Sequence, residues 1–312
     1  MRRREVILQA IGFGVAAAVL WWLGRNTAIT LEERGLSPTF DFLTRPASFE
    51  IGDAPIPYDP GDSFARAILV GLVNTARVSV LGWFLSIALG FVVGVLRLSG
   101  NPALRGVARA FVELMRNTPL LLLLLFLAAT MHALPSAQRA LEPLPGVFIS
   151  NRGLVLPYPL LGQFQLWLGA ALVASFLARR HLGRAGRWLV AAAATALVAA
   201  LVLTPPLWDV PRLRDFNFAG GLTFSPELAA LLAALVLHHA ANVSEVVRGA
   251  ILAVPHGQRE AAFALGLSRL QALRSVVVPQ ALRAMVPLLA SNCVSLTKNS
   301  SLAVAIGFPD VV

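Results

Sequence analysis

Long apolar runs recur along the chain, and they constrain its fold more than any other feature. A helix of about 20 apolar residues crosses the ~30 Å hydrocarbon core of a bilayer. Hydrophobic residues make up 57% of the chain and charged residues only 13%, whereas a soluble domain carries roughly 25% charged residues. The sequence therefore predicts an all-α, polytopic membrane protein of about seven spans, which we place near residues 6–24, 66–96, 110–131, 164–179, 187–204, 226–247 and 281–305.

The first apolar run admits two interpretations. Three arginines precede a run from Val6 to Leu23, which is also the pattern of a secretory signal. The run is long for a signal, it lacks a small-residue cleavage site, and it ends in Trp21-Trp22, a pair typical of a membrane interface. We therefore predict an uncleaved first span.

Arginine clusters alternate with acidic or proline-rich segments, and this alternation indicates how the spans are oriented. Cytoplasmic loops carry an excess of Arg and Lys, so we expect a cytoplasmic N-terminus. The net charge of +10 is spread over loops instead of one face, so we expect no nucleic-acid partner. The segments expected inside are 2–4, 97–109, 179–187 and 248–283, and those expected outside are 29–63, 134–160 and 205–222.

The chain lacks the residues that it would need for its own chemistry. It has no GxxxxGK[ST] sequence to cradle phosphates, and Lys298 is its one lysine. No group of His, Cys, Asp and Glu has metal-ligand spacing, and the adjacent His238 and His239 point to different helix faces. We therefore expect no cofactor, no metal and no enzyme activity.

One loop predicted to be cytoplasmic, residues 251–280, has a helical pattern of its own. Glu260, Ala261 and Ala262 begin a stretch whose small residues would let a short helix pack closely against another surface. Gly266 would end that helix, because glycine readily adopts the left-handed cap conformation. Pro279 is expected to stop the next segment before the following span. The pattern favours a docking element over a solvated linker.

This stretch is similar to the EAA signature of the permeases of ABC importers, EAA-x3-G-x9-I-x-L-P. The match covers Glu260, Ala261, Ala262, Gly266 and Pro279, with valine at the two aliphatic positions. The resemblance implies a type I importer permease fold in which this loop couples the spans to a separate ATPase. ATP and Mg²⁺ would then be bound by that partner.

Other segments resemble the polar amino-acid permeases, in particular their general L-amino-acid branch. The resemblance implies a subunit that translocates L-amino acids across the bacterial inner (plasma) membrane. Its implied partners are an ATPase dimer, a periplasmic amino-acid-binding protein and a second permease subunit, with which it would form a heterodimer or, as the alternative, a homodimer. The segments concerned are Gly71 to Ser79, Gly90 to Ser99, Glu113 to Leu121 and Lys298 to Ala303.

On this basis we divide the chain into four parts. They are an N-terminal span with an extracytoplasmic loop, a first core part, a subfamily insertion with two spans, and a second core part that holds the coupling loop, at 1–64, 65–133, 134–222 and 223–312.

The candidate residues of a substrate pathway are polar residues in or near apolar runs. Lys298 would cost about 2.5–3.5 kcal/mol at a bilayer centre, so it is expected at the interface or facing an aqueous cavity. Asn299 and Ser300 could contact a zwitterion or cap a helix. Arg116 and Glu113 could contact substrate, but their spacing favours a mutual ion pair.

Two further features concern how the predicted spans pack against one another. Arg77 lies inside a predicted span and requires an acid or a cavity. Gly90 and Gly94, with Ser86 before them, favour close helix packing, with a pathway role as the alternative.

Two alternative functions remain at this point. An ion-coupled secondary transporter would need carboxylates inside the membrane, and the predicted spans offer few: Glu113, Glu227 and Glu245. A truncated, non-transporting permease is the other alternative, because the family continues into a further span where this sequence stops at Val312.

Overall fold

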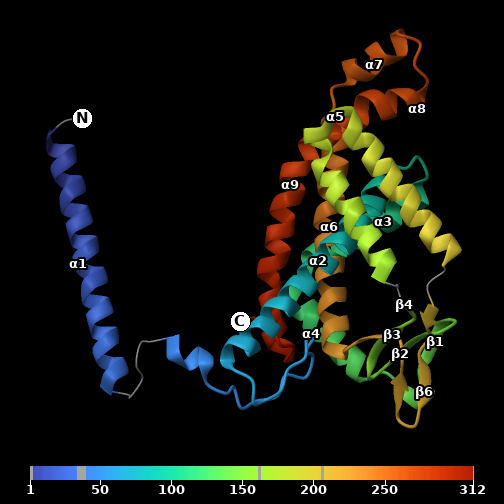
Figure 1. Ribbon diagram of the computed structural model, residues 1–312. Coiled ribbons are helices and arrows are strands. Elements are labelled where there is room, and N and C mark those ends of the chain that lie inside the picture. Colours follow the sequence, from blue (N-terminus) through green and yellow to red (C-terminus); the bar gives the residue numbers. More distant parts are fainter. Residues whose placement is uncertain (1–2, 34–39, 161–162, 205–206, 312) are drawn as a thin grey trace. The chain divides into compact units, whose positions relative to one another are not determined.

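The computed structural model describes residues 3–33, 40–160, 163–204 and 207–311 (Figure 1). These residues form two compact units. The first comprises residues 1–51 and 56–69, and the second comprises residues 52–55 and 70–312. The fold is mostly helical, as predicted.

The first unit contains the predicted N-terminal span and part of the loop after it. Helix α1 (Arg3–Glu33) is long and apolar enough to cross a membrane between Ile7 and Leu31, and none of that window is buried. The short 3₁₀ helix η1 (Phe40–Thr44) follows, and Phe64 packs its ring against Phe42 and Phe49 at 6.1 Å between centroids.

The second unit is a bundle of helices with short strands at one end. Its helices are α2 (Phe64–Leu96, from residue 70 on), α3 (Pro102–Asn117), α4 (Leu120–His132), η2 (Ala137–Arg139), α5 (Gln163–Leu203), α6 (Pro226–Leu252), α7 (His256–Ala264), α8 (Arg269–Ala272), the π-helical turn η3 (Leu273–Val277), α9 (Val278–Asn299) and η4 (Ser300–Ile306).

Helix α6 occupies the centre of this bundle. Ser225 caps it by accepting a hydrogen bond from the Leu228 amide, and Pro226 stands in its first turn, where a missing amide hydrogen costs nothing. Its leucines form an apolar core with Leu124 of α4 and Leu296 of α9. Helices α3, α4 and α9 all contact it.

Two glycines let α2 approach α6 closely, and this confirms the packing role favoured by the sequence. A Cβ atom at Gly90 would lie 2.5 Å from the Val243 Cβ and 2.7 Å from the Ala240 carbonyl oxygen. A Cβ at Gly94 would lie 2.9 Å from the Val247 Cβ. Small residues at such positions are a usual basis of helix association in membranes.

The predicted third span, residues 110–131, is not one continuous helix. It is divided between α3 and α4, which meet at an angle of 103°. The residue before a proline avoids the helical region, and Thr118 before Pro119 is extended, with φ −91° and ψ 121°. The proline then begins α4 with a new direction.

The predicted fourth and fifth spans belong to one element, α5, which is kinked at Gly183 (φ 54°). Their apolar parts, residues 165–178 and 188–201, are shorter than a full crossing. Within the described ranges, four helices are long and apolar enough to span a membrane, or five if the bent pair α3–α4 counts as one. The predicted count of seven is therefore not confirmed.

The segments 134–160 and 205–222, expected to lie outside the membrane, contain short antiparallel strands that the sequence did not predict. We call residues 141–160 and 207–224 the β lobe. One sheet has the order β1-β2-β3-β8, and two pairs, β4-β5 and β6-β7, accompany it. The strands are β1 (Leu141–Leu144), β2 (Val147–Ser150), β3 (Gly153–Leu156), β4 (Tyr158–Leu160), β5 (Leu207–Asp209), β6 (Arg212–Arg214), β7 (Asn217–Ala219) and β8 (Leu222–Phe224).

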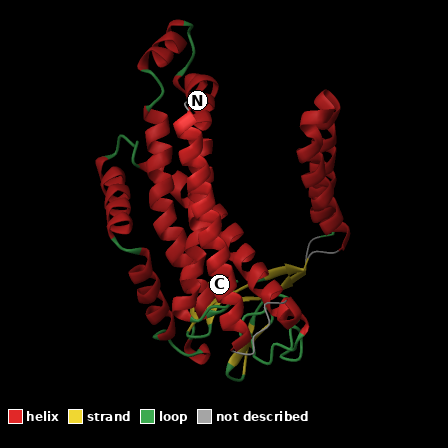
Figure 2. Cartoon of the chain, turned by 90° about the vertical axis from the view of Figure 1, so that its left-hand side faces the viewer, coloured by secondary structure: helices red, strands yellow, loops and turns green. Residues whose placement is uncertain are grey.

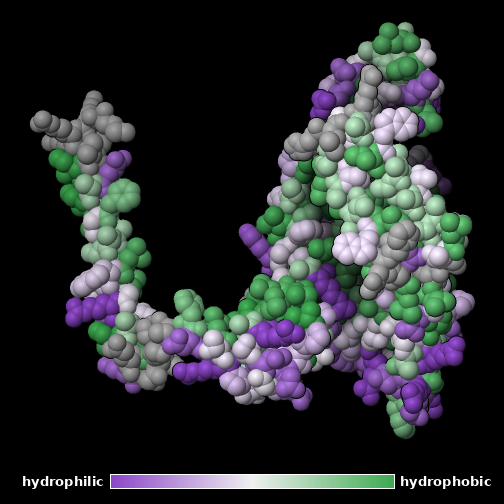
Figure 3. Space-filling view, viewed as in Figure 1, coloured by the Kyte–Doolittle hydropathy of each residue, from purple (hydrophilic) through white to green (hydrophobic). Residues whose placement is uncertain are grey.

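The β lobe and the α7–α8 segment lie at opposite ends of the second unit (Figures 1 and 2). The bend of α5, which contains the arginine-rich stretch 179–187, lies at the α7–α8 end (Figure 1). On the face seen in Figure 3, hydrophobic residues predominate over the helices between the two ends. Within this unit, the β lobe comes from segments expected outside, and the opposite end contains the α7–α8 segment and the α5 bend, which are expected inside.

The close contact between α2 and α6 predicts that Gly90→Ala destabilises the protein by about 1–3 kcal/mol, because the added methyl group overpacks a tight contact. Thermal unfolding of the detergent-solubilised protein measures this. Gly106→Ala is the matched control, since Gly106 is also helical and has open space around it. Equal unfolding temperatures for Gly90→Ala and the wild type would contradict the packing role.

Candidate coupling hairpin and pathway residues

The predicted helix in the loop 251–280 is present as α7, and Gly266 ends it as expected. Gly266 has φ +76°, a conformation that favours glycine. The Gly266 amide donates to the Phe263 carbonyl oxygen at 2.9 Å, and the Leu267 amide donates to the Ala262 carbonyl oxygen at 3.1 Å. These two bonds form a Schellman motif, which satisfies the last carbonyl groups of the helix.

Side-chain contacts to α6 and α9 hold α7 against the rest of the bundle. Ala262 is buried, whereas Ala261 is exposed, so only part of the small-residue face packs within this chain. The Arg259 guanidinium donates to the Ile251 carbonyl oxygen at 3.0 Å, at the end of α6. The Gln280 amide donates to the Gln258 side-chain oxygen at 3.2 Å, which joins α9 to α7.

After α7, the loop continues through α8 directly into the last long helix, α9. A capping box between Ser268 and Gln271 starts α8, which passes through the π-helical turn η3 into α9. We call residues 256–277 the coupling hairpin. Because residues Arg269–Ile306 form one apolar helical stretch, a displacement of the hairpin would be transmitted along α9.

The expectation that Pro279 stops a segment is wrong. Pro279 lies in the first turn of α9, and the helical path runs through it. A proline cannot donate to a preceding carbonyl group, and a π-helical turn immediately before it is one way for a helix to absorb that defect. The turn bonds the Val278 amide to the Leu273 carbonyl oxygen.

The tip of the coupling hairpin presents apolar side chains to its surroundings. Leu265 is 81% exposed and Leu270 is 73% exposed, and Phe263 is about half exposed. Glu260 is exposed as well, and its carboxylate lies 3.0 Å from His256 Nδ1. An apolar tip with a charged flank is typical of a protein-docking element, which distinguishes it from a solvated linker.

Two of the predicted pathway residues, Lys298 and Ser300, line one cleft of about 520 Å³. Thr75 and Trp83 of α2 and Asp310 also line this cleft. Both Thr75 and Ser300 donate hydrogen bonds to the Asp310 carboxylate, which the sequence analysis did not single out.

Asn299 faces a different neighbour, the buried His239 of α6. His239 Nε2 lies 3.2 Å from Asn299 Nδ2, and His239 Nδ1 lies 2.6 Å from Asn292 Oδ1. The ring therefore accepts from one asparagine and donates to the other, which joins α6 to α9. The spacing of seven between Asn292 and Asn299 places them on one helix face and could have indicated this bridge.

The predicted ion pair between Glu113 and Arg116 is wrong. Arg116 lies 3.2 Å from Glu245 of α6, and Glu113 lies 3.9 Å from Arg109. Glu245 also accepts from Arg97 at 2.9 Å and from Arg248 at 3.3 Å. Glu245 is less exposed than Glu113, so its attraction for Arg116 is less screened by solvent.

Arg77 finds the partner that the sequence could not identify. Asp53, in the segment before α2, lies 3.2 Å from its guanidinium. The Ser225 hydroxyl donates to the other Asp53 oxygen at 2.9 Å, and the Phe224 ring lies under the Arg77 guanidinium at 5.5 Å. The charge inside the predicted span is therefore compensated at the start of α6.

The left-handed conformation of Gly266 predicts that Gly266→Ala strains the end of α7 by about 1–2 kcal/mol. Hydrogen exchange of the α7 amides should accelerate in this variant. Gly257→Ala is the control, because a Cβ there meets no atom within 4 Å and Gly257 has no positive φ. Unchanged exchange in Gly266→Ala would show that the cap does not hold α7.

The arginines around Glu245 predict that Glu245→Gln destabilises the protein by about 1.5–3 kcal/mol, the value of charge-assisted hydrogen bonds. The side chain of Arg97, 10% exposed, would lose its carboxylate partner. Thermal unfolding measures the effect, and Glu113→Gln, which alters an exposed and longer pair, should change stability little. A larger loss of stability in Glu113→Gln than in Glu245→Gln would contradict the central role of Glu245.

Comparison with known proteins shows the family to which the chain belongs. Residues 86–311 match the family described as "Binding-protein-dependent transport system inner membrane component". This range includes the coupling hairpin and the helices α6 and α9. The chain belongs to this family of membrane components of transport systems.

Relatives match nearly the whole chain. The putative amino-acid ABC transporter permease protein YhdX of Escherichia coli (strain K12) is 39% identical over 99% of this chain and 83% of its own length. The general L-amino acid transport system permease protein AapQ of Rhizobium johnstonii is 37% identical over 99% and 82%. The glutamate/glutamine/aspartate/asparagine transport system permease protein BztB of Rhodobacter capsulatus is 34% identical over 99% and 84%.

Proposed function

We propose that the chain is the transmembrane permease subunit of an ATP-driven ABC importer that translocates L-amino acids. The names of its relatives and its family membership support this function. The observation that supports it most is the coupling hairpin, which has an exposed apolar tip and continues without a break into α9. Ion-coupled transport is not favoured, because Glu245 is already held by three arginines.

The proposed assembly contains an ATPase dimer, a second permease subunit and a periplasmic amino-acid-binding protein. ATP and Mg²⁺ would be bound by the ATPase, and this chain would have no enzymatic role of its own. We place the assembly in the bacterial inner membrane with a cytoplasmic N-terminus. The coupling hairpin then faces the cytoplasm and the β lobe faces the periplasm.

The proposed mechanism is alternating access. Closure of the ATPase dimer on ATP moves the coupling hairpin, and Glu260, Ala261, Ala262, Gly266 and Pro279 are the residues through which the motion passes. Helix α9 moves with the hairpin, and its bridge through His239 carries the motion to α6. A ligand alone shifts such an equilibrium only by its differential affinity, so ATP must supply the bias for uphill transport.

Substrate-pathway roles are proposed for the residues identified by sequence. Lys298 and Ser300 share a cleft, which supports a common role. Asn299, Arg116 and Glu113 engage other partners, so any role for them requires those contacts to rearrange during transport.

The docking role predicts that Glu260→Arg abolishes co-purification of the ATPase, because it reverses an exposed charge beside the apolar tip. The chain is expressed together with candidate ATPase and permease subunits, and the recovered subunits are quantified. Glu113→Arg reverses an equally exposed charge outside the hairpin and should leave recovery unchanged. Equal recovery with Glu260→Arg would argue against docking at the hairpin.

Uptake in proteoliposomes tests the transport function itself. The assembled complex, with binding protein outside and ATP inside, should accumulate radiolabelled L-amino acids. Lys298→Met should lower the initial rate severalfold while the ATPase stays bound, and Ser295→Ala, on the exposed side of α9, should not. An assembled complex that hydrolyses ATP without accumulating any L-amino acid would support a non-transporting permease.

A further inference from the structure

A second cleft lies at the β-lobe end of the bundle, apart from the pathway residues. Its volume is about 530 Å³, within the ~300–1,000 Å³ typical of small-molecule sites. Four separate segments contribute to its lining, which is Gly52, Asp53, His132, Asn151, Arg152, Thr223, Ser225, Pro226 and Glu227.

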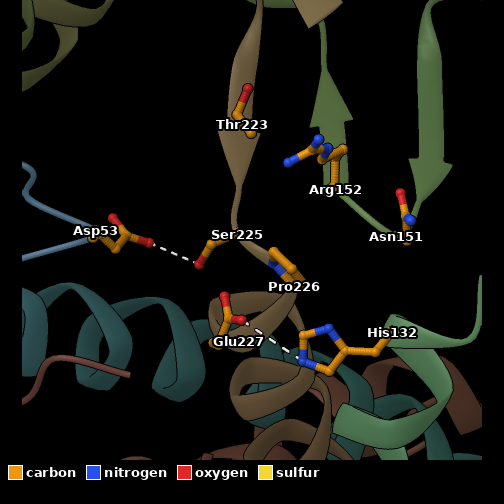
Figure 4. A pocket seen from close by; sticks show the side chains of 9 residues that line it. Asp53, His132, Asn151, Arg152, Thr223, Ser225, Pro226 and Glu227 are labelled. Carbon is orange, nitrogen blue, oxygen red and sulfur yellow. Dashed lines mark hydrogen bonds and ion pairs between the residues drawn. The ribbon is translucent and has the colours of Figure 1, made fainter. Parts of the chain in front are cut away.

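Opposite charges line this cleft on different elements. Arg152 stands on the tight turn between β2 and β3, and its guanidinium extends toward β8 (Figure 4). No carboxylate of the described residues lies within 4 Å of that guanidinium, so its charge is available to a ligand. Glu227 lies in the first turn of α6, on the far side of the cleft from Arg152 (Figure 4).

The other charges of the cleft are largely engaged. Asp53 is neutralised by Arg77 and accepts from Ser225. His132 lies 3.7 Å from the Glu227 carboxylate, too far for a good hydrogen bond, and it is charged only when protonated. The cleft therefore offers one available cation and one available anion, held apart by the β2–β3 turn and the start of α6.

Neutral polar groups also line the cleft. Thr223 of β8 contributes a hydroxyl group, which can donate or accept. The Oδ1 atom of Asn151 is buried and has no hydrogen-bond partner in the described part of the chain.

We propose that this cleft is a binding site for the zwitterionic head of a free α-amino acid. The Arg152 guanidinium binds the carboxylate, and the Glu227 carboxylate binds the ammonium group. The site lies at the end that we assign to the periplasm, so it receives the amino acid before the pathway. This inference rests on the proposed import of L-amino acids and adds to it a first binding site within the permease.

Direct binding tests the proposal on the full chain in lipid nanodiscs, with radiolabelled L-alanine as the probe. The wild type should bind alanine saturably. Arg152→Gln and Glu227→Gln should each weaken binding by about tenfold or more, since each removes a charge-assisted contact. Arg139→Gln is the matched control, because Arg139 is an exposed arginine of η2 outside the cleft and should bind as the wild type does.

Analogues identify the ligand chemistry. Propionate and ethylamine, which each keep one charge of alanine, should compete poorly. Stronger competition by O-phosphoethanolamine than by alanine would reassign the cleft to a lipid headgroup and overturn the proposal. Absence of saturable alanine binding, or equal binding by all four proteins, would also overturn it. ATP-driven uptake by the wild-type complex is judged separately, so uptake without cleft binding rejects this inference alone.

Discussion

The α6 helix is buried along most of its length, and the arrangement of the second unit depends on that burial. Lipid chains are as apolar as leucine, so helices in a membrane associate through close packing and polar contacts. Both kinds of contact converge on α6. Gly90 and Gly94 bring α2 against it, the α4 leucines pack on it, and His239 joins it to α9.

The same contacts connect the two ends of the bundle. At one end the coupling hairpin continues into α9, and two asparagines of α9 tie it to the buried His239 of α6. At the other end Ser225 begins α6 and also binds Asp53, the partner of Arg77 in α2. In the described part of the chain, packed helices and polar contacts therefore connect the hairpin end to the β-lobe end. A permease that alternates between two openings requires such a connection.

Sequence reasoning succeeded where one residue type dictates the backbone. Gly266 and the close-packing glycines were predictable because few other residues fit those positions. The bend before Pro119 was signalled by the proline but was outweighed by the apolar run around it. The β-lobe strands, three or four residues each, are too short to show an alternating pattern. The Arg77 and Glu245 ion pairs join segments distant in sequence, and a single sequence does not reveal such partners.

Site-specific photo-crosslinking from the tip of the coupling hairpin tests the central claim most directly. A photoreactive amino acid replaces Leu265, the most exposed apolar residue of the tip, and a second variant carries it at Leu144 in the β lobe. Irradiation of the assembled complex should attach the ATPase to position 265 and not to position 144. An ATPase adduct at position 144, or none at position 265 in a complex that retains the ATPase, would contradict coupling through the hairpin.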